Sequence, residues 1–222
     1  LYDGLACLGI NWVDRSPEEL KEIEDAFLVG STMGRLNSDD VLEARHIFLS
    51  KALGFSEEQI NTIKTYQRHA RLPLPMTIVD AAITVHESYG ANLMRAYRRN
   101  WRTLYYKGDY FIRHTDEIVE RFDCDPKTII EKCGNVYSRA RQARKTLDEL
   151  YEWLQQEGLA DKIKSAPELL ERSKEHLMAR QAEYESFGIG REKLLSNARL
   201  YLRKPKVIAR RVEFVRRLLE KT

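Results

Sequence analysis

The chain has little glycine, proline and cysteine, and these shortages narrow the fold class. Its 222 residues include 11 glycines, 6 prolines and 3 cysteines. Such a composition, with abundant Leu, Glu, Lys, Arg and Ala, favours helix over sheet, and we expect almost no strand. Low-complexity stretches are also missing, which argues against disorder. Because 43% of the residues are hydrophobic, the chain can bury a substantial core, as one globular domain or as one stack of repeats.

Motifs for metals, cofactors and catalysis are missing from the sequence. Cys7, Cys124 and Cys133 form no CxxC pair, and the five histidines form no HxxxH or HExxH pattern. We therefore expect no metal, no cofactor and no disulfide framework, and a reducing compartment fits best. No glycine-rich phosphate loop and no nucleophile elbow occur either. The sequence indicates that the protein is not an enzyme.

Long hydrophobic runs are missing as well. Charged residues interrupt each apolar stretch well before the roughly 18 to 20 residues that cross a bilayer, so we expect no membrane partner. The sequence begins at Leu1 with neither a signal-peptide nor an Arg-rich transit pattern. We expect a mature or trimmed form, whose location composition does not reveal.

Charge is abundant but unevenly distributed, although the net charge is only +3. Residues 14–25 carry six acids against two bases, whereas residues 199–217 carry eight bases against one acid. Two further basic runs lie at residues 95–107 and 139–145. A phosphate-binding surface requires such asymmetry. The simpler interpretation is that these runs are solvated helix faces.

Capping residues and glycines divide the chain into short helical units. Helix ends are predicted at five points that lie 30 to 36 residues apart, a spacing typical of helical solenoids. These points are Gly54, Gly90, Asp123, Gly158 and Gly188, and Gly9 is a further end. Helix starts are predicted at Ser16 with Glu19, at Ser56 with Gln59, at Ser38 and at Asp125-Pro126.

The last three units align with one another. Residues 130–137, 163–170 and 194–201 each open a unit, and a longer amphipathic helix follows each of them. One unit cannot bury its apolar stripe alone, so neighbouring units must stack. Arg141, Arg172 and Arg203 are equally spaced in these units, and stacking would align them on one face. Coincidence is the alternative, because one residue in six is Lys or Arg. The apolar positions of the three long helices are Leu147, Leu150 and Leu154, then Leu177, Tyr184 and Phe187, then Val207, Val212, Phe214 and Leu218.

Residues 163–173, Ile-Lys-Ser-Ala-Pro-Glu-Leu-Leu-Glu-Arg-Ser, and the helix that ends Tyr-Glu-Ser-Phe-Gly-Ile at 184–189 resemble the repeat of the mitochondrial transcription termination factor (mTERF) family. Residues 53–60 are similar to its inter-repeat junction. The resemblance covers 41–222, matches poorly over 72–110, and lacks the repeat's proline at 135–137 and at Ala198. It implies an all-α, left-handed superhelix of short helical repeats. We accordingly expect one domain over 1–222, with an acidic N-terminal repeat or cap at 1–40 and mTERF-like repeats at 41–222.

The resemblance further implies that a concave basic face binds double-stranded DNA in transcription termination or regulation, in the mitochondrial matrix or alternatively in chloroplasts. Its C-terminal repeat would direct Arg199 at a guanine. Binding of ribosomal RNA in mitoribosome assembly is the alternative within the family, and a protein-binding helical scaffold is the alternative outside it. We expect a monomer. The predicted nucleic-acid-binding residues are Arg98, Arg99, Arg102, Arg139, Arg141, Arg144, Lys145, Arg172, Arg199, Tyr201, Arg203, Lys204, Lys206, Arg210 and Arg211.

Aromatic residues near the basic runs have two interpretations. Tyr137 and Tyr201 either stack on exposed bases or pack in the core. For Trp153, Phe187 and Phe214 the pattern favours the core.

Overall fold

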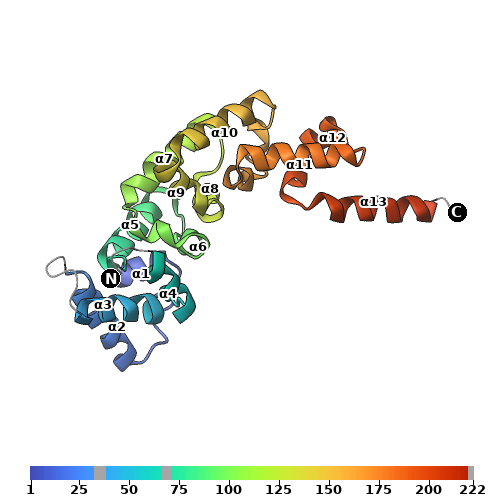
Figure 1. The fold of residues 1–222 in the computed structure, drawn as a ribbon. Coiled ribbons are helices and arrows are strands. Elements are labelled where there is room, and N and C mark those ends of the chain that lie inside the picture. The colour runs from blue at the N-terminus through green and yellow to red at the C-terminus, as the bar shows by residue number, and fades with distance from the viewer. Residues whose placement is uncertain (33–38, 67–71, 220–222) are drawn as a thin grey trace. The chain divides into compact units, whose positions relative to one another are not determined.

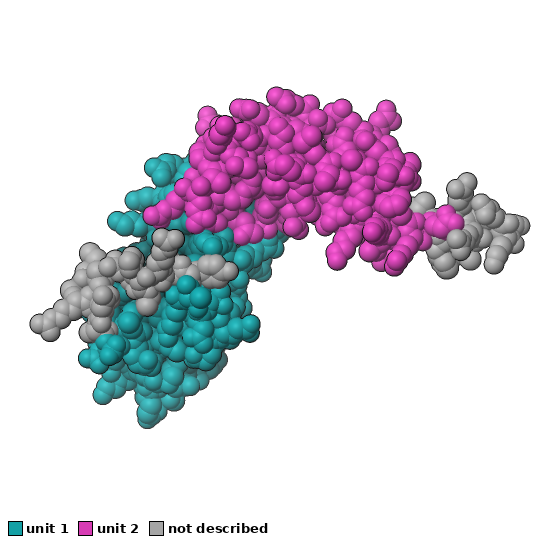
Figure 2. Space-filling view, in the orientation of Figure 1, with its two compact units in different colours: residues 1–117, 126–134 teal, residues 118–125, 135–222 magenta. Residues whose placement is uncertain are grey.

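A computed structural model describes residues 1–32, 39–66 and 72–219 of the chain. Every regular element in these ranges is helical, and no strand occurs in them, which confirms the all-α prediction (Figure 1). The chain divides into two compact units, shown in Figure 2. Unit 1 comprises residues 1–117 and 126–134, and unit 2 comprises residues 118–125 and 135–222. The continuous superhelix and the single domain stay predictions.

Unit 1 is built from paired helices around an apolar core. Helix α2 packs on α3, α1 packs on α5, and α6 packs on α8. Phe48, Leu49, Ile60, Val85 and Tyr97 are fully buried between these helices. The helices are α1 (Tyr2–Cys7), α2 (Pro17–Gly30), α3 (Asp39–Ile47), the π-helical turn η1 (Phe48–Ala52), α4 (Glu57–Tyr66), α5 (Pro75–Tyr89), α6 (Met94–Arg99), the 3₁₀ turn η2 (Trp101–Tyr105), the first part of α7 (Gly108–Phe122) and α8 (Pro126–Lys132).

Unit 2 alternates short and long helices. Its core contains Tyr137, Leu150, Leu154, Leu169 and Tyr184, all fully buried. Its elements are the end of α7, α9 (Gly134–Gln142), α10 (Arg144–Gln156), the 3₁₀ turns η3 (Ala160–Lys162) and η4 (Pro167–Glu171), α11 (Lys174–Ser186), α12 (Arg191–Ser196), the 3₁₀ turn η5 (Ala198–Leu202) and α13 (Pro205–Leu219).

The predicted helix starts agree with the structure wherever it describes them. Ser16 and Glu19 form a reciprocal capping box at the start of α2. Ser56 and Gln59 exchange the same two hydrogen bonds at the start of α4, at 2.8 and 3.3 Å. Helix α8 begins at Pro126, directly after Asp125. The cap predicted at Ser38 lies outside the described residues.

The predicted helix ends between successive repeats are also confirmed. All five points have a left-handed backbone, with φ of 68° at Gly54, 61° at Gly90, 47° at Asp123, 71° at Gly158 and 76° at Gly188. A residue in this conformation stops a helix, because its N–H turns back onto the last carbonyls. The spacing of 30 to 36 residues predicted from the sequence is therefore the spacing of helix ends in the structure.

Burial separates the aromatic residues more sharply than their sequence pattern does. Tyr137 and Tyr201 are fully buried, and Trp153 is 5% exposed, as its core assignment predicts. The core prediction for Phe187 is wrong, because this ring is 44% exposed just beyond the end of α11. The side chain of Phe214, and those of Val212 and Leu218, lie outside the described residues. None of the helices within the described ranges is long and apolar enough to cross a membrane.

Candidate nucleic-acid interface

The turns after η4 and η5 have the same geometry and each exposes an arginine. Arg172 follows η4 with φ −96° and ψ 154°, and Arg203 follows η5 with φ −99° and ψ 156°. In both turns the arginine N–H donates to a carbonyl three residues earlier, Leu169 O at 3.1 Å and Leu200 O at 2.9 Å. The extended residue redirects the chain into the long helix that follows. The 31-residue register therefore joins two structurally equivalent positions.

Arg141 does not share that position. It lies in the last turn of α9, a nine-residue α-helix, where η4 and η5 are five-residue 3₁₀ turns. The extended position that follows η2 is occupied by Tyr106, with φ −98° and ψ 138°. The turn is thus a recurring structural feature, and a basic residue occupies it after η4 and η5.

An exposed basic segment begins at the turn after η5 and continues into α13. Arg203, Lys204, Lys206, Arg210 and Arg211 are all exposed. Within the described residues none of the five forms an ion pair. No acid occurs in the sequence between Glu192 and Glu213, so the positive charge of this segment is not neutralised along the chain. Such a segment attracts phosphate groups over a distance set by the salt concentration.

Two predicted arginines instead hold backbone carbonyls at or just after the end of a short helix further along the chain. Arg99 donates from Nη1 to Lys132 O in unit 1. Arg139 donates from Nη1 to Leu170 O at 3.1 Å and to Arg172 O at 2.9 Å in unit 2. Burial lowers the pKa of the Arg139 guanidinium from its ordinary value. We call this contact the arginine clamp, and it satisfies carbonyls that a helix end leaves unpaired.

A glutamate accompanies each arginine clamp. Glu131 accepts a hydrogen bond from the backbone N–H of Asn92 at 3.3 Å, and Glu171 accepts one from that of Asn135 at 3.3 Å. Glu131 also forms an ion pair with Arg95 at 3.0 Å. The acceptor pairs 131–132 and 171–172 lie 40 residues apart, as do Arg99 and Arg139. The same kind of connection, between two helices that a long helix (α7 or α10) separates in the chain, therefore occurs once in each unit.

Arg199, the predicted guanine-reading residue, contacts the turn before η4. Its Nε and Nη2 donate to Ser165 O at 3.2 and 3.0 Å. This is the contact of an arginine that caps a neighbouring helical unit. The side chain is nonetheless exposed. Presenting Nη2 together with Nη1 to a guanine would require Arg199 to release part of this cap.

The remaining predicted residues differ in availability. Arg98 is exposed, whereas Arg102 lies over the ring of Trp101, with 4.7 Å between its Cζ and the ring centroid. Arg144 forms an ion pair with Asp148 at 3.0 Å. Lys145 reaches Glu149 only at 4.0 Å, and its side chain is 92% exposed.

Tyr201 is not available for stacking on a base. Its ring is fully buried, and its hydroxyl donates to Gln181 Oε1 at 3.1 Å. Burial raises the pKa of Tyr201 to about 12. The base-stacking interpretation of this residue is therefore wrong, since a base needs an open ring face.

Among the described residues, no group of three His, Cys, Asp or Glu side chains is placed to hold a metal ion. No disulfide joins Cys7, Cys124 or Cys133. Burial raises the pKa of Cys124 to about 11, which keeps this thiol neutral at pH 7.

Comparison with known proteins does not identify the chain. No family model, no curated protein and no solved structure matches it.

Proposed function

We propose that the chain is a helical-repeat protein of the mTERF type that binds double-stranded DNA and acts in mitochondrial transcription termination or its regulation. The observation that carries the proposal is the exposed basic segment formed by the turn after η5 and the first two turns of α13. Its cations are unneutralised in the described part of the chain and lie on consecutive turns, an arrangement suited to consecutive phosphates.

The recurring connections support a superhelical repeat architecture. The arginine clamp occurs in both units, and the turn geometry of Arg172 returns at Arg203. In a solenoid, each repeat contacts its neighbours through the same set of contacts. We propose that the short elements and the turns after them form the DNA-facing edge, because Arg172, Arg203 and Lys204 are exposed there.

The proposed activity is binding, with the arginines in two separate roles. Arg99 connects α6 with α8 and Arg139 connects α9 with η4. Arg172, Arg203 and the basic residues of α13 meet phosphate. Arg199 belongs to both groups in our proposal, as a cap in the free protein and a base contact in the complex. Its exposed fork offers donors suited to guanine O6 and N7.

Fluorescence anisotropy with labelled nucleic acids tests the proposal. The full chain is titrated into duplex DNA, duplex RNA and single-stranded DNA of equal length. We expect the DNA duplex to bind most tightly and its affinity to fall steeply with salt. With about six phosphate contacts, log K should fall against log salt with a slope of about −5.

Two results would contradict the proposal in different ways. Absence of binding to any nucleic acid at about 50 mM salt would end it, since phosphate attraction is strongest there. Tighter binding of duplex RNA than of duplex DNA would replace the DNA target with structured RNA. The protein-binding alternative is favoured by a separate observation in unit 1, the acidic groove between α2 and α3.

A further inference from the structure

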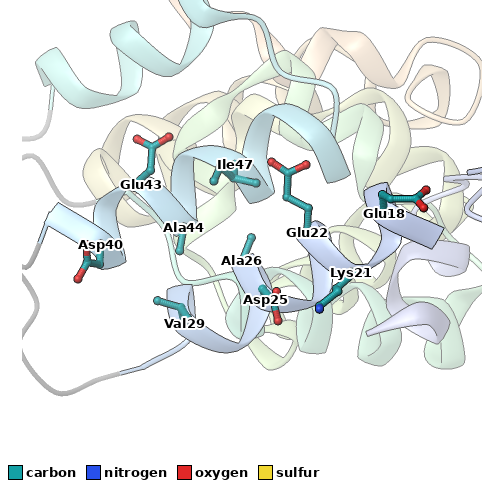
Figure 3. Close-up of a pocket in the computed structure, with 10 residues that line it drawn as sticks. All are labelled: Glu18, Lys21, Glu22, Asp25, Ala26, Val29, Asp40, Glu43, Ala44 and Ile47. Carbon is teal, nitrogen blue, oxygen red and sulfur yellow. The ribbon is translucent and has the colours of Figure 1, made fainter. Parts of the chain in front are cut away.

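Helices α2 and α3 of unit 1 border an open surface groove of about 550 Å³ (Figure 3). Five carboxylates line it, against a single lysine, Lys21. The acidic side chains come from both helices, as Figure 3 shows. They are Glu18, Glu22, Asp25, Asp40 and Glu43.

Most of this negative charge is not neutralised. Glu22 forms an ion pair with Lys51 at 2.5 Å. Glu18, Asp25, Asp40 and Glu43 are exposed, and none of these four has an ion-pair partner within the described residues. Four carboxylates along one groove repel each other, and a cationic partner would relieve that repulsion.

The floor of the groove is apolar, and two of its side chains are small. Ala26 and Ala44 lie on the facing helices, with Val29 and Ile47 beside them (Figure 3). Val29 lines the groove and is 42% exposed. Small residues between two helices allow a third helix to approach closely. An apolar strip bordered by charge of one sign matches an amphipathic helix whose polar face carries the opposite sign.

We infer that the groove between α2 and α3 is a docking site for a cationic amphipathic helix of a protein partner. The lining residues run from Glu18 to Val29 on α2 and from Asp40 to Ile47 on α3, so the groove extends about 16 Å along α2, enough for about three helical turns. Apolar side chains of the partner would cover Val29 and Ile47 and rest on Ala26 and Ala44, which are only 3% and 6% exposed. Its lysines or arginines would meet the carboxylates. Nucleic acid is excluded as the occupant, because its phosphates would face Glu18, Asp25 and Glu43. The inference does not depend on the proposed DNA binding, whose cations lie in unit 2.

The test uses the full chain and three labelled 14-residue peptides. One peptide places leucines at i, i+3, i+4 and i+7 with lysines elsewhere, a second scrambles this order, and a third replaces lysine with glutamate. We expect the ordered lysine peptide to bind at least tenfold more tightly than either other peptide. Equal binding of the scrambled peptide would show that only general charge attraction holds the peptide, and it would overturn the inference.

Charge variants locate the binding. The triple substitution Glu18→Lys, Asp25→Lys and Glu43→Lys should weaken binding of the ordered peptide at least tenfold. The matched control reverses three exposed acids that do not line the groove, and it should change binding less than twofold. Equal loss in both variants would overturn the inference. The control substitutions are Glu58→Lys, Glu87→Lys and Glu120→Lys.

An apolar pair of variants tests the floor. Val29→Asn should weaken binding of the ordered peptide several-fold, while Leu28→Asn should leave it unchanged. Leu28 is the adjacent residue, is 67% exposed and does not line the groove. Equal effects would overturn the role of the groove floor.

Sedimentation of the chain alone distinguishes the occupant. We expect no self-association. Self-association that the triple groove variant abolishes would replace the external partner with a second copy and overturn the inference as stated. Unchanged DNA affinity in the triple groove variant would show that self-association through the groove is independent of the proposed DNA binding.

Discussion

The salt dependence of DNA binding offers the most direct test of the exposed basic segment. The variant replaces Arg203, Lys204 and Lys206 with glutamine, which removes three charges and keeps a polar side chain at each position. All three residues are exposed and unpaired within the described part of the chain. We therefore expect folding to be unchanged, because surface substitutions of this kind shift stability by about 0.5 kcal/mol or less.

The expected magnitude follows from counterion release. Each phosphate contact contributes about 0.9 to the slope of log K against log salt, so three lost contacts should reduce the slope by about 2.7. Between about 50 and about 200 mM salt, a fourfold change, the wild type should then lose about 40-fold more affinity than the variant. The two proteins should differ most at low salt and converge at high salt.

Anisotropy titrations of one duplex at several salt concentrations measure this slope. The matched control replaces Lys21, Lys51 and Lys64 with glutamine, which changes the net charge equally in the acidic part of unit 1. Lys51 forms an exposed ion pair with Glu22, which contributes little to stability. An unchanged slope in the Arg203, Lys204 and Lys206 variant would refute the phosphate-contact argument. An equal decrease in the control would show that net charge matters and position does not.

Three further predictions concern single side chains. Arg199→Ala should cost about 1 to 3 kcal/mol on a preferred duplex and flatten the preference at one base pair if the side chain reads guanine, whereas uniform loss on single-base variants would indicate a backbone contact. Arg139→Ala removes the two hydrogen bonds of its clamp and should lower the free energy of unfolding by about 2 to 4 kcal/mol in urea titrations, while an equal loss for the exposed control Lys145→Ala would contradict the clamp. Burial, helped by two nearby arginines, lowers the pKa of His176, so the unfolded chain binds more protons there and stability should fall as pH drops below about 6.5. His176→Gln should remove this component of the pH dependence, and an unchanged pH profile would assign it to other groups.

The sequence alone determines the local features of this protein. A capping box needs only Ser16 and Glu19, three residues apart, and its hydrogen bonds form within one turn. The helix ends at Gly54, Gly158 and Gly188 similarly depend on one residue each, a glycine whose backbone adopts the left-handed conformation. The all-α class and the length of the repeats are therefore predictable, because short-range interactions decide them.

Only the tertiary structure decides what each arginine does. Arg139, Arg172 and Arg199 look alike in the sequence, as basic residues near the start of a repeat. Contacts 31 to 34 residues away assign Arg139 to Leu170 O and Arg172 O, and Arg199 to Ser165 O, while the side chain of Arg172 stays exposed.

The same distinction explains the aromatic residues. Tyr201 and Phe187 are both large rings near helix ends, yet Tyr201 is fully buried and Phe187 is 44% exposed. Burial depends on which helices pack over a ring, and those helices come from distant parts of the chain. The acidic groove has the same origin, because Ala26 and Ala44 become its floor only when α2 packs against α3. The sequence alone shows the negative charge of residues 14–25. The apolar floor, which the inferred docking site also needs, forms only where two helices are in contact.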